Sequence, residues 1–95
     1  MIQILAKVNI EDLQKFIAMF ATRGAALRAK HGSHGSRVFT VDGDPSQVCI
    51  LFDWESRAAF EAFRADPDVK ASMAASGTLA PPEFTFLAAA ASFPS

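Results

Sequence analysis

The sequence predicts an α+β domain with the ferredoxin-like order β-α-β-β-α-β, in which a four-stranded antiparallel sheet carries its helices on one face. Three observations support this fold class. Residues 2–8 alternate apolar and polar side chains, as a strand with one buried face does. From residue 13 onward, apolar residues recur at helical spacing. Residues 37–42 and 47–54 are two further strand patterns joined by a short turn, which favours an antiparallel hairpin.

The first helix is expected to begin after Asn9, whose side chain can cap the free N–H groups of the first turn. The apolar stripe extends this helix over about 20 residues. Gly32 is the expected stop, and Arg28 and Lys30 near the end suit the negative pole of the helix dipole.

The second half of the chain repeats the pattern of helix followed by strand. A helix is expected over residues 56–64, and a second one restarts at Asp66 and stops at Gly77. The last strand is expected at residues 83–89. The whole chain, residues 1–95, is expected to form a single domain.

The predicted strands are apolar on both faces, although only one face meets the helices. In the third strand Phe52 and Trp54 point to one side, while Cys49 and Leu51 point to the other. The chain is also 51% hydrophobic, more than a small isolated domain easily hides. We therefore expect a homodimer that packs the two open sheet faces against each other.

Charge and cysteine content exclude several classes of partner. The net charge is −1 with no run of Lys or Arg, so nucleic acid is not an expected partner. No apolar run is long enough for a membrane span and the first residues do not form a signal peptide, so no membrane partner and a cytoplasmic location are expected. Cys49 is the only cysteine, which rules out an intrachain disulfide.

A local motif gives a family resemblance. The stretch from Trp54 to Phe60, "WESRAAF", ends a strand and opens a helix, and "FRADPDVKASM" follows it. This combination resembles the dimeric α+β barrel superfamily and, within it, the antibiotic biosynthesis monooxygenase-like branch. The resemblance implies a dimeric barrel of two ferredoxin-like protomers. Members include cofactor-independent oxygenases of polycyclic phenols, haem-degrading enzymes, isomerases and proteins without known activity, so the fold alone does not give the reaction.

The resemblance also indicates which chemistry to exclude. Haem-degrading members use a first-strand Asn, a helix Trp and an iron-binding His. Here the Trp position falls near Phe63, the His position falls near Met73, and Asn9 is the only candidate Asn. No haem or other cofactor is therefore expected. Oxygenation of a phenol without a cofactor requires a base and a dry pocket.

The candidate catalytic residues are His34, Asp53 and Asn9. His31 and His34 lie in the stretch "KHGSHGS" and titrate near neutral pH, so His34 could act as a general base at a cavity mouth, or the stretch could be a helix stop and surface loop. Asp53 could be a buried base with a raised pKa, or a solvent-facing carboxylate. Asn9 could be a catalytic amide, or the helix cap. No third ligand marks a metal site, so none is expected.

Aromatic residues suggest a cavity between the helices and the sheet. An aromatic-lined cavity favours a flat apolar ligand, whereas the alternative is a filled core. Arg37 could bind a carboxylate or enolate but could equally be solvated, and Cys49 fits an inert buried thiol. The candidate lining residues are Trp54, Phe16, Phe20, Phe60, Phe63 and Met73.

Two functional hypotheses follow. The first is a cofactor-independent, monooxygenase-like enzyme acting on a small apolar or aromatic molecule. The second is a non-catalytic dimeric module, for ligand binding or stress response, that lacks the reactive residues of its family.

Overall fold

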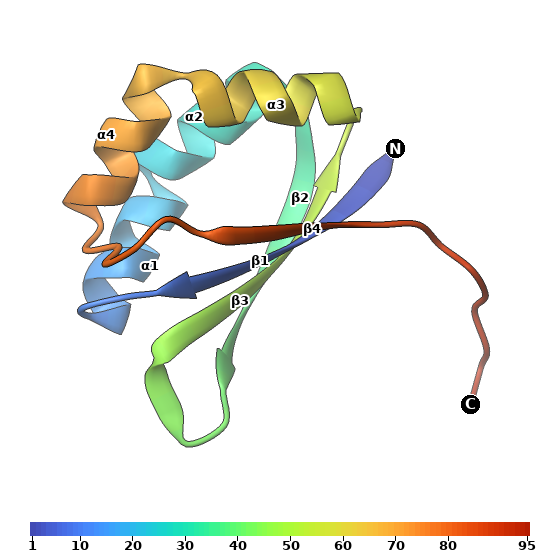
Figure 1. Cartoon of the computed structure of the whole chain (residues 1–95), viewed down its shortest axis with the longest axis horizontal. Coiled ribbons are helices and arrows are strands. Elements are labelled where there is room, and N and C mark those ends of the chain that lie inside the picture. The colour runs from blue at the N-terminus through green and yellow to red at the C-terminus, as the bar shows by residue number, and fades with distance from the viewer.

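A computed structural model describes all of residues 1–95 and confirms the ferredoxin-like α+β fold. All four helices lie on one side of a single four-stranded antiparallel sheet (Figure 1). No helix is long and apolar enough to span a membrane. The elements are β1 (Ile2–Asn9), α1 (Leu13–Ala21), α2 (Arg23–His31), β2 (Ser33–Val41), β3 (Asp44–Trp54), α3 (Arg57–Ala65), α4 (Pro67–Ala75) and β4 (Glu83–Leu87).

The sheet has the strand order β2-β3-β1-β4, so the two strands that flank α1 and α2 in the chain lie two places apart. The register pairs Ile4 with Phe52 and Ala6 with Ile50, and these side chains face the helices and are buried. The neighbouring pair, Leu5 and Leu51, faces the other side, which carries no helix (Figure 1). The two-faced apolar pattern of the strands is therefore present in the folded chain.

The predicted single first helix is two helices, and this boundary was wrong. The break is at Thr22, whose backbone leaves helical geometry at φ −112° and ψ −90°. The Thr22 hydroxyl donates to the carbonyl oxygen of Ala18 at 2.7 Å, a back-bond that bends helices. Gly24 follows two residues later and weakens the helix further. The break allows α2 to turn and cover a different part of the sheet from α1.

The N-cap of α1 was also predicted three residues too early. Asp12, not Asn9, caps the helix, and its carboxylate accepts the N–H of Lys15 at 3.1 Å. Asn9 is instead the exposed last residue of β1 and pairs with Gln47. The short link between Asn9 and Asp12 remains extended because Ile10 bonds across to Ser46 and forms a bridge with Thr78.

The stretch "KHGSHGS" is less of a loop than expected. Gly32 does end α2, with φ at 99°, a region that only glycine adopts cheaply. The strand β2 then begins immediately at Ser33, which pairs with Trp54, and a bulge lies between Ser33 and Gly35. Pairing with β3 thus overrides the low strand propensity of this Gly/Ser segment.

The core lies between the helices and the inner face of the sheet. Trp54 and Phe60 are both fully buried, and their ring centroids are 5.1 Å apart. The Trp54 indole N–H donates to the carbonyl oxygen of His31 at 3.1 Å, which joins the end of β3 to the end of α2. This corner sets the positions of the helices that enclose the candidate site.

Candidate functional site

A cavity of about 80 Å³ lies between the helices and the inner face of the sheet. By the usual allowance this holds roughly five waters, the scale of one six-membered ring. Its floor is formed by strand residues, and all four helices contribute to its walls. Aromatic and other apolar side chains dominate the lining: Phe16, Met19, Phe20, Leu27, Phe52, Phe63, Val69, Met73 and Phe84.

Arg28 is the only titratable residue that lines this cavity. Its side chain, on α2, is 9% exposed, and one guanidinium nitrogen donates to the carbonyl oxygen of Phe20 at 2.9 Å. The guanidinium carbon also lies 3.6 Å from the centre of the Phe20 ring, a cation–π contact. No carboxylate pairs with it, and burial lowers the pKa of Arg28 to about 10. The cavity therefore contains an uncompensated positive charge at neutral pH.

Gly24 creates the space for this guanidinium. A Cβ at Gly24 would lie 2.9 Å from Nη1 of Arg28 and 3.1 Å from the carbonyl oxygen of Met19. Glycine at this position thus lets the arginine fold back along its own helix toward Phe20. The α1–α2 break and the buried arginine belong to one arrangement.

The hydroxyl groups in the lining are of two kinds. Ser76 donates to the carbonyl oxygen of Met73 at 2.7 Å and lies 3.2 Å from the hydroxyl of Thr78. Ser72 is 7% exposed and its hydroxyl forms no hydrogen bond within the chain, yet no fully enclosed side-chain N or O lacks a partner. Its hydroxyl therefore keeps contact with accessible space, and the cavity is the space that Ser72 lines.

A wider groove of about 410 Å³ adjoins the cavity and shares Phe63, Met73 and Phe84 with it. Two cations, Arg64 and Lys70, line this groove, and no acidic residue does. Arg64 pairs with Glu61 at 3.2 Å, whereas Lys70 forms no ion pair. A ligand larger than one ring could occupy both spaces, and an anion approaching the mouth would meet a positive rim.

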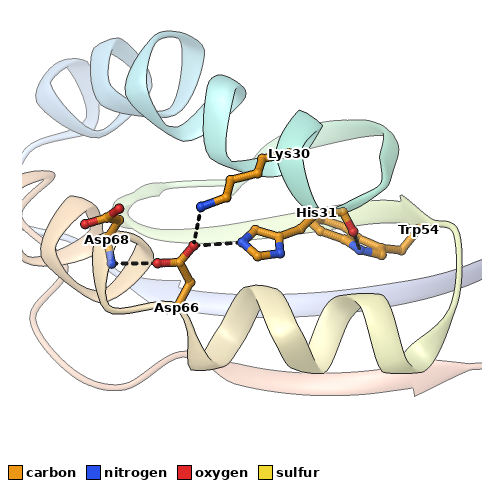
Figure 2. Close-up of polar contacts among 5 residues, drawn as sticks. All are labelled: Lys30, His31, Trp54, Asp66 and Asp68. Atoms are coloured by element: carbon orange, nitrogen blue, oxygen red, sulfur yellow. Dashed lines mark hydrogen bonds and ion pairs between the residues drawn. The ribbon is translucent and has the colours of Figure 1, made fainter.

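A polar junction joins His31, at the end of α2, to Asp66, which caps α4; Figure 2 shows these side chains. The His31 Nε2 lies 2.8 Å from Oδ2 of Asp66. The rings of His31 and Phe63 pack edge-on with their centroids 5.9 Å apart. Asp66 also caps α4 by accepting the N–H of Asp68 at 2.9 Å. These bonds, with the imidazole partner contributing most, lower the pKa of Asp66 to about 2. The junction ties the end of α2 to the α3–α4 corner that carries part of the cavity wall.

The three residues considered as catalytic do not line the cavity. Asp53 lies on the open face of the sheet, where it accepts the side-chain amide of Gln3 at 3.2 Å. His34 is exposed in the bulge of β2, and Asn9 is exposed at the end of β1. Cys49, expected to be buried, is partly exposed on the open face, and Arg37 lies exposed near Phe39. Their catalytic roles stay predictions that the cavity geometry does not support.

The predicted lining residues divide into two groups. Phe16, Phe20, Phe63 and Met73 all line the cavity. Trp54 and Phe60 do not, because they are fully enclosed in the core beside it. Both support the wall indirectly, since the centroid of the Phe63 ring lies 4.8 Å from that of Trp54.

Sequence reasoning missed Arg28, which was assigned only to the helix dipole. The signal was present, since Arg28 lies four residues after Gly24 and eight after Phe20, in line with the apolar stripe. A cation on the apolar side of a helix is rarely buried without a partner, and this departure marks it as functionally interesting.

The comparisons with known proteins agree with this architecture. Residues 1–75 match the antibiotic biosynthesis monooxygenase family, and the chain belongs to that family. No curated protein sequence matches the chain closely enough to serve as a relative.

Solved structures share the fold along the full chain. SnoaB, a cofactor-independent oxygenase from Streptomyces nogalater, aligns with a TM-score of 0.79 at 19% identity over 99% of this chain and 97% of its own. A crystal structure of an antibiotic biosynthesis monooxygenase aligns with a TM-score of 0.73 at 14% identity, over 96% of this chain and 100% of its own. An uncharacterized NIPSNAP domain protein from Burkholderia xenovorans aligns with a TM-score of 0.67 at 21% identity, over the whole of both chains. At these identities the likeness shows the fold.

Proposed function

We propose that this protein is a cofactor-independent monooxygenase-type enzyme that oxidises a small aromatic molecule in the cavity between its helices and its sheet. The observation that carries the proposal is the Phe-lined cavity with an adjoining groove. Family membership and the shared fold with SnoaB, an oxygenase that needs no cofactor, support it.

The reaction that fits such a site needs no external reductant. A phenol with an unsubstituted ring carbon para to its oxygen can lose its proton and pass electrons to dioxygen. One oxygen atom forms a bond to that ring carbon, the ring C–H bond breaks, and the O–O bond breaks to release water. The phenol loses four electrons and becomes a quinone, so a naphthol plus dioxygen gives a naphthoquinone plus water. The cavity contributes by orienting the ring and excluding water from the intermediate.

We also propose that the working form is a homodimer through the open sheet face, in the cytoplasm, where the single Cys49 thiol would stay reduced. Support comes from the apolar surface of that face, where Phe39 is 48%, Val41 39% and Leu87 39% exposed. Leu5 and Leu51, paired across β1 and β3, continue the same surface. A second copy would cover it with like side chains, as a two-fold interface requires.

The dimer is tested by light scattering after gel filtration. The expected result is twice the chain mass for the wild type and a shift toward monomer for Leu51→Lys. Ala62→Lys, which introduces the same charged side chain on the exposed side of α3, should remain dimeric. A wild type that runs as a monomer at all concentrations would contradict this part of the proposal.

The activity is tested by oxygen uptake with a panel of naphthols, in the presence of a metal chelator. Isotope-labelled dioxygen should place one labelled atom in the quinone and one in water. The control is Ser72→Leu, which fills the cavity with an apolar side chain. Product formation that does not depend on the protein, or that survives the cavity-filling change, would refute the proposal.

The alternative is a non-catalytic binding module, and one observation favours it: no group in the cavity lining can act as a general base. The same experiment separates the two functions. A binding module would retain the naphthol without consuming oxygen.

A further inference from the structure

We propose that Arg28 is an anion-binding group and that the ligand of this cavity is a flat aromatic molecule carrying one ionised oxygen. This inference rests on the proposed function only in that an aromatic molecule occupies the cavity. It adds the charge state of that molecule and the residue that recognises it.

The first step is the state of the guanidinium donors. An arginine side chain has five N–H donors, and Arg28 uses its Nη2 on the carbonyl oxygen of Phe20. Its Nε and Nη1 make no hydrogen bond. No side-chain nitrogen or oxygen that is fully buried lacks a hydrogen-bond partner, so these two atoms are not fully buried. These atoms therefore reach accessible space, although the residue as a whole is only 9% exposed. The cavity that Arg28 lines is where free donors of this kind can meet a ligand.

The second step is charge. Buried arginines normally pair with carboxylates, because an unpaired buried charge is costly. Here the lining contains no Asp or Glu, and the adjoining groove adds Lys70 and Arg64 but no acid. A ligand that brings one negative oxygen would supply the missing partner, and the free hydroxyl of Ser72 offers a second donor.

The third step is the shape of the ligand. The rings of Phe16, Phe20, Phe52, Phe63 and Phe84 line the same cavity as Arg28, and the guanidinium carbon lies 3.6 Å from the centre of the Phe20 ring. Such a lining disfavours small hydrated anions such as phosphate and favours an aryl ring that is apolar except at one oxygen. Because a nearby positive charge stabilises the ionised form of an acid, Arg28 would favour release of the proton of a bound phenol to water, without a protein base. This accounts for the missing base in the lining.

The test uses nitrophenol, which titrates near neutral pH and whose phenolate absorbs visible light. Its neutral methyl ether, nitroanisole, has nearly the same shape. In the wild type, the pKa of bound nitrophenol should fall by about one unit or more relative to free nitrophenol. That pKa shift requires nitrophenolate to bind about tenfold or more tightly than neutral nitrophenol, and nitroanisole, which cannot ionise, should bind as weakly as the neutral form. Nitrobenzoate as a third probe distinguishes an aromatic acid from a phenol as the preferred anion.

Variants assign the effect to the guanidinium. Arg28→Met should remove the preference for the anion and leave nitroanisole binding intact, whereas Arg28→Lys should keep part of it because the charge remains without the planar fork. Arg23→Met, at the exposed start of the same helix, is the matched control and should behave as wild type. Arg28 also donates a hydrogen bond to the carbonyl oxygen of Phe20 near the end of α1, so replacing it can disturb the fold. A second pair of variants therefore leaves Arg28 in place. Met73→Glu places a carboxylate in the same lining and should abolish the preference, whereas Met73→Gln should retain it.

The outcomes separate this inference from the proposed function. Anion preference that depends on Arg28 supports it. Equal binding of nitrophenolate and nitroanisole, or an unshifted pKa of the bound probe, overturns it while leaving an aromatic cavity in place. Failure to bind any of the probes overturns both the inference and the proposed aromatic ligand.

Discussion

Replacing Phe60 by alanine should remove the centre of the aromatic core that supports the cavity wall. The Phe60 side chain is fully buried. Its ring centroid lies 5.1 Å from that of Trp54, 5.2 Å from that of Phe84 and 5.9 Å from that of Phe63. Deleting a buried Phe costs about 3–5 kcal/mol, and this site has little means to collapse because its neighbours are rigid rings. A 95-residue domain has roughly 5–14 kcal/mol of stability in total, so Phe60→Ala should consume much of it.

Urea denaturation followed by tryptophan fluorescence measures this loss directly, since Trp54 is the only tryptophan and is fully buried. At one fixed protein concentration, which keeps the contribution of dimer dissociation equal for both proteins, the midpoint should fall strongly with little change in slope. Phe93→Ala is the matched control, because Phe93 is 79% exposed and its loss should be nearly neutral. A Phe60→Ala loss below about 1 kcal/mol would refute the assignment of this residue to the core centre.

Three further predictions concern the cavity and its supports. Ser72→Leu should abolish binding of nitroanisole as seen by calorimetry, while Ala71→Leu on the exposed side of α4 should not; retained binding would show that the ligand sits elsewhere. Asp66 has a folded pKa of about 2, below its ordinary 3.8, so its stabilising effect is complete above about pH 4 and is lost as the pH falls toward 2. The melting temperature of Asp66→Asn should therefore fall less than that of the wild type between about pH 4 and pH 2. If the melting temperatures of the two proteins fall in parallel over this range, the result argues against the His31 junction. Gly32→Ala should lower stability by roughly 1–2 kcal/mol, because its φ of 99° is left-handed and a Cβ would lie 2.8 Å from Glu55 Oε2; a neutral change in thermal unfolding would contradict this.

Strand alternation and the hairpin turn were sufficient to predict the topology of this chain. The period-two pattern predicted that Ile4 and Phe52 lie on one face of their strands and Leu5 and Leu51 on the other, and the register of the sheet pairs them accordingly. Helix periodicity placed Phe16, Phe20 and Phe63 toward the sheet, where they line the cavity. These features depend on local spacing, which one sequence records.

The features that sequence patterns did not predict depend on contacts that exist only in the folded chain. The break at Thr22 requires a hydroxyl back-bond that only the folded helix shows, and the early start of β2 at Ser33 requires its partner strand. The burial of Arg28 depends on the α1 carbonyl that accepts its hydrogen bond and on the space left by Gly24. The open-face position of Asp53, by contrast, could be predicted from strand parity, because Asp53 lies between the buried Phe52 and Trp54.

The central claim, that the space between helices and sheet is a ligand site, is tested most directly by methyl NMR of labelled methionine. The chain has three methionines. Met19 and Met73 line the cavity, whereas Met1 is 81% exposed and serves as an internal control. An aromatic ligand in the cavity should shift the Met19 and Met73 methyl signals through its ring current and leave Met1 unchanged. Saturable binding of nitroanisole or nitrophenol with no shift at Met19 or Met73 would contradict the account.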